Sequence, residues 1–409
     1  MRRLSGFVTL LIACMALPAL TPSQAQEQTI KQDEGRRIGT PKFHRMGSRA
    51  VPLQYIVILD RDAEVIEGDR RVANRTATEL TEDLGAIALN VYSHAVSGFS
   101  AQMTEEQALK LSEDPRVRFV EEDSIIELET TQSNAPWGLD RIGQRDLPLN
   151  GVYSYTTTGV GVHAYIIDTG IRVTHTQFGG RASAAFDSIG DGQNSNDCNG
   201  HGTHVSGTVG GSTYGVAKGV LLHAVRVLNC SGSGTTSGVI AGVDWVTANH
   251  ISPAVANMSL GGGASDALDT AVRNSISSGV TYSVAAGNSN TDASTSSPAR
   301  VSEAITVGSS TMSDARSSFS NFGSVVDIFA PGSSIVSAWN TSNTATATLS
   351  GTSMATPHVT GVAARFLQSN PGSTPAQVRN AIVNAATTNH LSGIPSGTAN
   401  RLLFWSSSQ

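Results

Sequence analysis

The spacing of hydrophobic and polar positions divides this chain into four parts. An apolar run over residues 4–20 directly follows Met1, Arg2 and Arg3. Residues 26–50 are polar and basic and show neither a helical nor a strand period, which indicates a linker. Residues 51–131 alternate between short apolar runs and amphipathic segments, and residues 132–409 form the longest part.

We expect residues 51–131 to form a small α+β unit. Short apolar runs typical of strands cover residues 55–59, 86–91, 98–101 and 117–122. Helices are predicted over residues 67–84 and 104–112, and the second opens with Thr104 as a cap and a Glu at the third position. The order strand-helix-strand-strand-helix-strand predicts a ferredoxin-like unit.

Two segments of the long C-terminal part locate its candidate chemistry. Residues 162–167 are apolar and β-branched, which predicts a buried strand, and Asp168 follows directly. Strand ends are where open α/β sheets place their chemistry. Residues 357–368 carry apolar side chains at three- and four-residue spacing, which predicts a helix with Pro357 in its first turn.

Ser353 lies where a loop of small residues meets this predicted helix. The unpaired N–H groups and the positive dipole end of a helix favour developing negative charge, which suits a nucleophile. A serine before a helix is also a common N-cap. The assignment of Ser353 therefore depends on its partners.

Three upstream residues supply such partners. Asp168 follows a predicted strand, His201 lies in the glycine-rich run 199–207, and Asn288 ends the apolar run 284–288. Asp, His and Ser are the orienter, base and nucleophile of acyl-transfer catalysis, and an amide can donate to an oxyanion. Taken singly, Asp168 could be a cap, His201 a structural or metal-bound histidine, and Asn288 a turn residue. The four residues in this order favour catalysis.

In these motifs the chain resembles the subtilisin-like serine proteases, and within them the proteinase K branch with its aqualysin-type bacterial relatives. The matching segments are residues 167–170, 199–207, 257–262, 285–288 and 351–358. The resemblance implies one α/β domain over residues 132–409, with a mainly parallel sheet and helices on both faces.

The same resemblance implies a role for each candidate residue. Ser353 is the nucleophile and His201 its base, while Asp168 holds His201 in the right tautomer. Asn288 and the Ser353 N–H form the oxyanion hole. His204, three residues after His201, belongs to the helix and does not act as the base.

Substrate-binding residues are also implied by the resemblance. The walls of the main specificity pocket are Ser259, Leu260 and Gly261 on one side and Ala285, Ala286 and Gly287 on the other. An edge that pairs with extended substrate consists of Gly232, Ser233 and Gly234. These walls contain no carboxylate, so we expect broad cleavage after apolar and aromatic residues. Thr236 stands where relatives often have Tyr, which leaves the selectivity of the more distant pocket open.

The ferredoxin-like unit resembles the inhibitory propeptide of this family. It would help the protease to fold and block its cleft, with residues 125–131 lying in the active site as product. The competing interpretation is an unrelated substrate-binding domain.

Because residues 1–25 combine a basic start, an apolar run and small residues before the cleavage site, they predict a secretory signal peptide. Cys14 also permits a lipoprotein signal.

Charge limits the possible partners. The net charge is −6, but residues 133–409 hold 13 Asp and Glu against 12 Lys and Arg, so most of the excess lies in the N-terminal third. No basic patch argues for nucleic acid. We expect a secreted monomer that acts on protein and peptide substrates, with its own propeptide as inhibitor and no membrane attachment in the mature form.

The last two predictions concern a disulfide bond and structural calcium. In an exported protein the pair Cys198 and Cys230 predicts a disulfide, against a reactive thiol or a metal site as alternatives. No cofactor is expected for catalysis. The resemblance implies structural calcium on oxygen ligands. The candidate ligands are Asp327 with backbone oxygens near Ser302 and Ala304, and Asp191 and Asp197 in the loop before His201.

Two other functions compete with a secreted self-processing endopeptidase. A catalytically dead relative could serve as a binding or structural protein, but every catalytic position is filled. An esterase or lipase would have the Gly-x-Ser-x-Gly elbow, which the sequence around Ser353 lacks.

Overall fold

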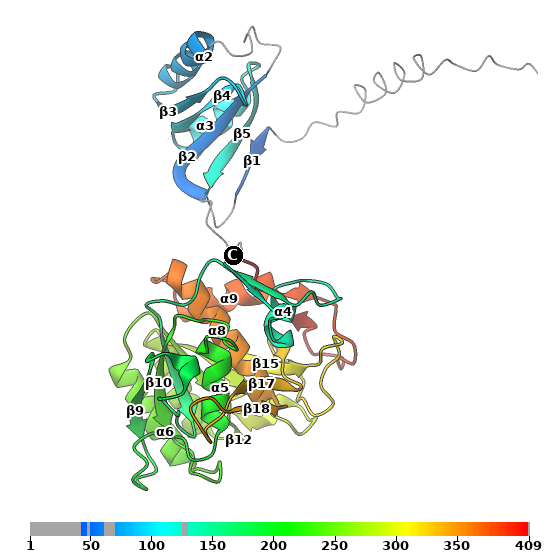
Figure 1. Ribbon diagram of the computed structural model, residues 1–409. Helices are drawn as coiled ribbons and strands as arrows, with labels where there is room; N and C mark the ends of the chain where they lie inside the picture. The colour runs from blue at the N-terminus through cyan, green and yellow to red at the C-terminus, as the bar shows by residue number, and fades with distance from the viewer. Residues whose placement is uncertain (1–41, 47–49, 61–69, 125–129, 408–409) are drawn as a thin grey trace, which may run out of the picture. The chain divides into compact units, whose positions relative to one another are not determined.

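The computed structural model describes residues 42–46, 50–60, 70–124 and 130–407, which belong to two compact units, Met1–Ile126 and Glu127–Gln409 (Figure 1). The predicted signal peptide, Cys14 and most of the predicted linker lie outside the described residues. No helix in the described ranges is long and apolar enough to cross a membrane.

The first unit is a five-stranded sheet with order β1-β5-β2-β4-β3, antiparallel except for the β1–β5 pair. Its elements are β1 (Phe43–His44), β2 (Ala50–Leu59), α2 (Arg70–Glu82), β3 (Ile87–Tyr92), β4 (Gly98–Gln102), α3 (Glu105–Ser112) and β5 (Val117–Ser124). The predicted element order is confirmed. One difference is β1, which lies inside the predicted linker and pairs with β5.

Side chains on one sheet face form the core of this unit. Val57, Phe99 and Val120 are fully buried, and they pack against Ala77 of α2 and Leu111 of α3. The predicted cap at Thr104 forms, but its partner is Gln107 and not a Glu. The third helical position is the one whose side chain reaches back to the cap, and Gln107 occupies it.

The second unit is built on a nine-stranded sheet with order β19-β20-β16-β15-β13-β11-β8-β10-β9. Its strands are β8 (His163–Asp168), β9 (Ala182–Asp187), β10 (Leu221–Arg226), β11 (Ala254–Met258), β13 (Thr281–Ala285), β15 (Ile305–Ser310), β16 (Ile328–Pro331), β19 (Thr387–Thr388) and β20 (Arg401–Leu402). All neighbours are parallel except β19 and β20. The predicted mainly parallel sheet is confirmed.

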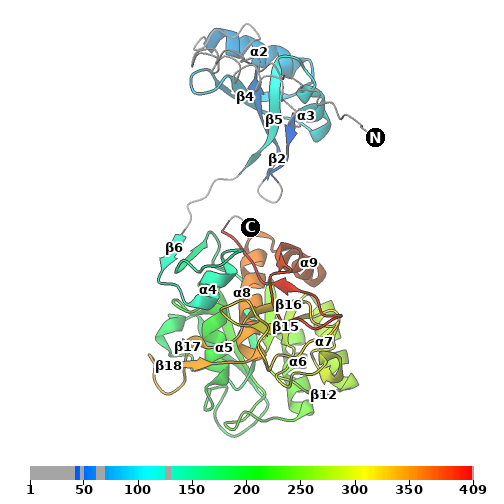
Figure 2. The ribbon, with the colours of Figure 1, turned by 90° about the vertical axis from the view of Figure 1, so that its right-hand side faces the viewer.

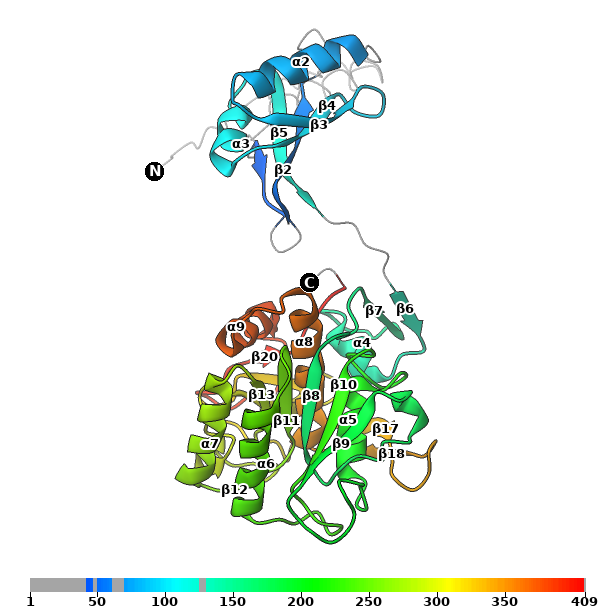
Figure 3. The same ribbon diagram turned by 90° about the vertical axis from the view of Figure 1, so that its left-hand side faces the viewer.

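Helices cover both faces of this sheet, as predicted (Figure 3). One face packs against α4 (Trp137–Ile142), α5 (His201–Gly210), α8 (Thr352–Ser369) and α9 (Pro375–Ala385). The other face packs against α6 (Thr236–Asn249) and α7 (Asp266–Ser277). Central strands such as β11 are buried on both faces, which explains their apolar sequences.

Shorter elements lie outside the nine-stranded sheet and the helices that cover it. They are three two-stranded antiparallel sheets and two 3-10 turns, η2 (Thr176–Phe178) and η3 (Ala293–Thr295). The sheets are β6 (Thr130–Ser133) with β7 (Val152–Tyr155), the hairpin β17 (Ile335–Ala338) with β18 (Thr346–Leu349), and β12 (Gly262–Gly263) with β14 (Ser296–Ser297). Thr131 pairs with Ser154, so the last residues of the predicted propeptide belong to a two-stranded sheet with β7. Residues 125–129 lie outside the described residues.

The start of α8 differs from the prediction. The helix begins at Thr352, five residues earlier than expected, and its N-cap is Gly351. Ser353 is therefore the second helical residue and not the cap, and Pro357 lies beyond the first turn. Met354 is the one large apolar residue between Gly351 and Pro357, and a single such residue gives no apolar spacing, so periodicity alone placed the start too late.

Candidate active site

The candidate catalytic residues gather at one edge of the large sheet. Asp168 is the last residue of β8, Ser259 follows β11, and Asn288 follows β13 by three residues. Parallel neighbours end at the same edge of a sheet, which brings these three segments together. Helices α5 and α8 begin beside them with His201 and Ser353 in their first turns.

Asp168 and His201 form a short contact. The Nδ1 atom of His201 lies 2.7 Å from Oδ1 of Asp168, whose side chain is fully buried, while the His201 side chain is 26% exposed. The same carboxylate oxygen accepts the Thr169 N–H at 2.7 Å. A carboxylate can only accept here, so the shared proton lies on Nδ1 and Nε2 keeps its lone pair.

A glycine makes this contact possible. A Cβ atom at position 202 would lie 2.2 Å from the Gly170 carbonyl oxygen and 3.2 Å from Oδ1 of Asp168. Helix α5 can approach the end of β8 this closely because residue 202 has no side chain. The glycine-rich run around His201 thus has a steric function.

Burial alone would lower the pKa of His201. The negative charge of Asp168 and its hydrogen bond outweigh burial, with a smaller contribution from Asp197, so the pKa of His201 is raised above its usual value. The site therefore stabilises the imidazolium that forms when His201 accepts a proton.

Ser353 has reciprocal bonds with Ser259. Its hydroxyl donates to the Ser259 carbonyl at 3.1 Å, and the Ser259 hydroxyl donates to the Ser353 carbonyl at 2.9 Å. The Ser353 carbonyl is available because residue 357, which would normally donate to it within the helix, is a proline without an N–H. In this arrangement the Ser353 hydroxyl is bonded to Ser259 and not to His201.

Asn288 has a fixed orientation. The N–H of Thr352 donates to its side-chain oxygen at 2.8 Å, and the Thr352 hydroxyl donates to the same atom at 2.9 Å. A backbone N–H cannot accept, so the atom facing Thr352 must be Oδ1. The Nδ2 group of Asn288 therefore remains a donor beside the start of α8.

The two other histidines near the site have backbone partners. His204 is fully buried and contacts the carbonyl oxygens of Ile335 and Ala347, in the β17–β18 hairpin that lies beside α5 (Figure 2). His358 is buried and contacts the Met354 carbonyl. Burial lowers the pKa of each histidine to about 4.

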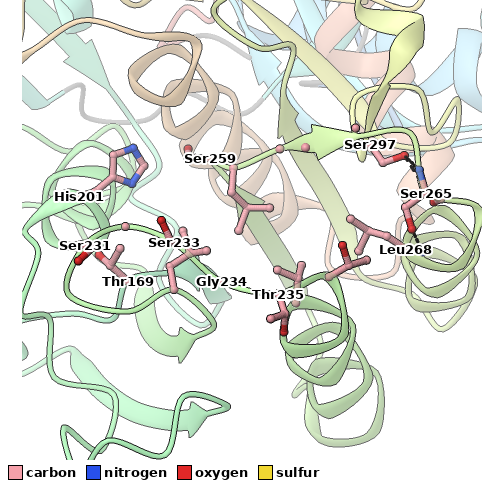
Figure 4. A pocket seen from close by; sticks show the side chains of 18 of the residues that line it. Thr169, His201, Ser231, Ser233, Gly234, Thr235, Ser259, Ser265, Leu268 and Ser297 are labelled. Atoms are coloured by element: carbon pink, nitrogen blue, oxygen red, sulfur yellow. Dashed lines mark hydrogen bonds between the residues drawn. The ribbon is translucent and has the colours of Figure 1, made fainter.

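Two adjoining hollows lie along this edge. The larger, of about 600 Å³, contains His201, Ser259 and the predicted edge 232–234, and Figure 4 shows His201 at one end and Leu268 at the other. The smaller, of about 350 Å³, contains Ser353, Asn288 and the predicted wall 285–287. Leu260 and Gly261 line both. Neither lining includes an Asp, Glu, Lys or Arg residue.

The predicted disulfide is confirmed. Cys198 and Cys230 are bonded, with their Cα atoms 4.9 Å apart. Asn199 donates its side-chain amide to the Cys230 carbonyl at 3.0 Å. The bridge therefore joins the loop before His201 to the loop that carries Gly232. The alternatives of a reactive thiol or a metal site do not apply to this pair.

The predicted calcium ligands already have protein partners. Asp327 binds Arg379 and accepts the Thr306 N–H, and Asp191 forms a two-point ion pair with Arg226. Both oxygens of Asp197 accept hydrogen bonds.

Ala304 is buried, and the Ser302 hydroxyl donates to Glu303. Among the described residues no group of three His, Cys, Asp or Glu side chains could hold a metal ion. The carboxylates therefore form no cluster that could hold calcium, and we assign no site to them. A site made of Asp327 and backbone oxygens near Ser302 and Ala304 stays a prediction from the resemblance.

Several residues of the site were not predicted from the sequence. Thr352 orients Asn288, and Leu228, Val239 and Leu268 form part of the larger hollow. Thr352 directly precedes the candidate nucleophile Ser353, and this position was the one feature of the sequence that could have identified it as a site residue. The three apolar residues come from distant segments, and nothing in their local sequence marks them.

A parallel sheet that ends in an Asp–His pair, beside a serine at a helix start, defines the class of the serine hydrolases. Residues 159–400 match the protein family described as "Subtilase family", and residues 54–129 match the family described as "Peptidase inhibitor I9". Over 368 residues the chain is 53% identical to an "Extracellular serine proteinase" of Thermus sp. (strain Rt41A), which covers 87% of this chain and 90% of that protein.

Another relative is the "Alkaline serine exoprotease A" of Vibrio alginolyticus, 50% identical over 364 residues, covering 87% of this chain and 68% of that protein. A solved cold-adapted subtilisin-like serine proteinase is similar with a TM-score of 0.65 and 59% identity, covering 66% of this chain and 98% of that one. The chain belongs to the subtilase family. It is a serine endopeptidase preceded by a propeptide domain of the inhibitor I9 type.

Proposed function

We propose that this chain is a secreted, self-processing endopeptidase in which Ser353, His201 and Asp168 act as the catalytic triad. The observation that carries the proposal is the 2.7 Å contact between His201 and the buried Asp168, at the sheet edge where α8 begins with Ser353. This contact leaves Nε2 of His201 as the free basic nitrogen.

The first chemical step requires one rotation. The Ser353 hydroxyl turns from the Ser259 carbonyl toward Nε2 of His201, which takes its proton while Oγ attacks the scissile carbonyl carbon. A C–O bond forms and the carbonyl π bond opens to an oxyanion. Asp168 stabilises the imidazolium, which then gives the proton to the leaving amine as the C–N bond breaks.

The oxyanion has two donors in this proposal. The Nδ2 group of Asn288 is one, because Thr352 occupies the Oδ1 side of that amide. The other is the Ser353 N–H, which has no partner within the helix because it belongs to the first turn of α8. Donors fixed before the reaction need no reorganisation, and each contributes on the order of 3–4 kcal/mol to transition-state binding.

We further propose a broad preference for apolar and aromatic residues at the cleavage site. The uncharged linings of both hollows support this, since neither offers a counter-ion to a Lys or Arg side chain of the substrate. Residues Gly232, Ser233 and Gly234 are exposed, and the N–H groups of Gly232 and Ser233 and the Ser233 carbonyl already bond to Asn229. The Gly232 carbonyl and the Gly234 backbone would therefore pair with extended substrate.

Maturation and export belong to the same proposal. The I9-type domain would inhibit the protease until cleavage near Thr131, and residues 1–25 would direct secretion, as the name of the Thermus relative supports. The products are a mature monomer of residues 132–409 and a released inhibitor. Structural calcium stays a prediction that rests on the resemblance, and no catalytic step depends on it.

Self-processing tests the proposed function. The Ser353→Ala variant should accumulate as the unprocessed pro-form, while wild type should mature and digest casein. Ser369→Ala is the matched control, because Ser369 lies exposed at the other end of α8. A Ser353→Ala variant that matures at the rate of wild type would refute the assignment of the nucleophile.

A further inference from the structure

Asp197 is a buried carboxylate with an unusual number of hydrogen bonds. Only 3% of its surface is exposed, and five donors point at it. Oδ1 accepts from the Thr169 hydroxyl at 2.9 Å and from the N–H groups of Asn199 and Gly200 at 2.9 and 2.8 Å. Oδ2 accepts from the N–H and the hydroxyl of Thr203 at 2.9 and 2.6 Å. These donors occupy both oxygens of the carboxylate.

The donors come from the two segments that carry the catalytic pair. Thr169 follows Asp168 at the end of β8, and Thr203 follows His201 by two residues in α5. The Gly202 N–H also donates to the Thr169 hydroxyl at 2.9 Å. Asp197, Thr169 and Thr203 thus form a closed network that fixes the end of β8 against the start of α5.

The charge of Asp197 is not neutralised by a cation. Within the described ranges its five donors are backbone N–H groups and hydroxyls, and it forms no ion pair with Lys, Arg or His. The carboxylates of Asp187 and Asp191, by contrast, are both paired with Arg226. A buried, unpaired negative charge acts over a longer range than an exposed one, since solvent screens it less.

We propose that Asp197 is a positioning residue for the catalytic pair, which holds His201 against Asp168 and stabilises the imidazolium formed during the reaction. This inference rests on the proposed function of His201 as the base. It assigns to Asp197 a role in catalysis in place of the calcium ligation expected from the sequence. Asp197 does not touch the reacting atoms and acts through His201.

Two carboxylates act on the charge of His201, and a third titratable group, His204, lies nearby. Asp168 contributes from β8 and Asp197 from the preceding loop, and both raise the pKa of His201 against the effect of burial. His204 lies on the same helix, and burial lowers its pKa to about 4, so it is uncharged near neutral pH. Loss of the Asp197 charge should therefore lower the pKa of His201.

The Asp197→Asn variant tests both parts of the proposal. An amide presents an NH₂ group to either three or two of the five donors, so the network must open on one side. We expect kcat/KM on a chromogenic peptide to fall on the order of 10- to 100-fold, with most of the loss in kcat. The acidic limb of the kcat/KM profile, which reports the free-enzyme pKa of the base, should move to lower pH.

Asp191→Asn is the matched control. It removes the same charge from the same loop, but Asp191 is exposed and paired with Arg226. Its acidic limb should coincide with that of wild type. An Asp197→Asn enzyme that folds, keeps kcat/KM within about twofold of wild type and shows an unmoved acidic limb would overturn the proposal. A large loss of kcat with an unchanged acidic limb of the kcat/KM profile would overturn the claim that the charge of Asp197 stabilises the imidazolium of His201.

Thr203→Val provides a second test if Asp197→Asn does not fold. It removes one hydroxyl donor from Oδ2 but retains the charge. We expect a lower kcat with an unchanged acidic limb, and an unchanged kcat would refute the positioning role. If Ser353→Ala retains full activity, the proposed function itself fails, whatever these variants show.

Discussion

The Gly202→Ala substitution adds a single methyl group at the closest approach between α5 and β8. The new Cβ would lie 2.2 Å from the Gly170 carbonyl oxygen, which is backbone and cannot swing away. It would also lie 3.2 Å from Oδ1 of Asp168. Either the start of α5 or the end of β8 must therefore move.

The required movement can be estimated from contact distances. A carbon and an oxygen without a hydrogen bond rest at about 3.3 Å or more, so the two segments must separate by about 1 Å. That displacement would stretch the 2.7 Å contact between His201 and Asp168 beyond hydrogen-bonding range. A misplacement of about 1 Å can cost about 100-fold in rate, and overpacking of this kind costs about 1–3 kcal/mol of stability.

Peptide hydrolysis and thermal unfolding together measure this effect. We expect Gly202→Ala to lower kcat/KM by about 100-fold and to slow propeptide removal, while the mature protein still unfolds cooperatively. Gly372→Ala is the control, because a Cβ there would meet nothing within 4 Å. A folded Gly202→Ala enzyme with wild-type kcat/KM would refute the argument that this glycine sets the geometry of the catalytic pair.

Three further predictions follow from the same structure. Asn288→Leu should lower kcat about 100- to 1000-fold with little change in KM, and steady-state kinetics that show an unchanged kcat would exclude Asn288 as an oxyanion donor. Replacing both Cys198 and Cys230 with Ser should lower the free energy of unfolding by about 3–4 kcal/mol, since the bridge spans 32 residues; a denaturant midpoint equal to that of wild type would contradict this. His204 and His358 each have a folded-state pKa of about 4, so the unfolded chain binds their protons first as pH falls, and each should remove about 3 kcal/mol of stability between pH 6.5 and 4. Urea unfolding of Ser353→Ala with a free energy that is flat across this range would show that these histidines do not titrate as described.

Strands β2 to β5 of the first unit and β8 of the second were predictable because their hydrophobic patterns are simple. The buried run before Asp168 and the ferredoxin-like order of the first unit follow from local sequence. The start of α8 could not be predicted in this way, because the residues between Gly351 and Pro357 are held in the helix by contacts with Ser259 and Asn288. Periodicity cannot detect a turn in which Met354 is the one large apolar side chain.

The candidate site was predictable where residues form compact motifs, and not where it depends on long-range pairing. Ser353, His201 and Asp168 each lie in a short recognisable segment. The partner of Asp327 could not be read from the sequence, since Arg379 lies 52 residues away, and Thr169 lies 28 residues from Asp197. An aspartate in a loop looks the same in sequence whether it binds calcium, an arginine or five hydrogen-bond donors.

Covalent labelling of the nucleophile tests the central claim most directly. Mature wild-type protein treated with a fluorophosphonate should lose peptidase activity in step with the incorporation of one label, and peptide mapping by mass spectrometry should locate that label on Ser353. Stoichiometric inactivation with the label on another residue, or full activity after quantitative labelling of Ser353, would contradict the account.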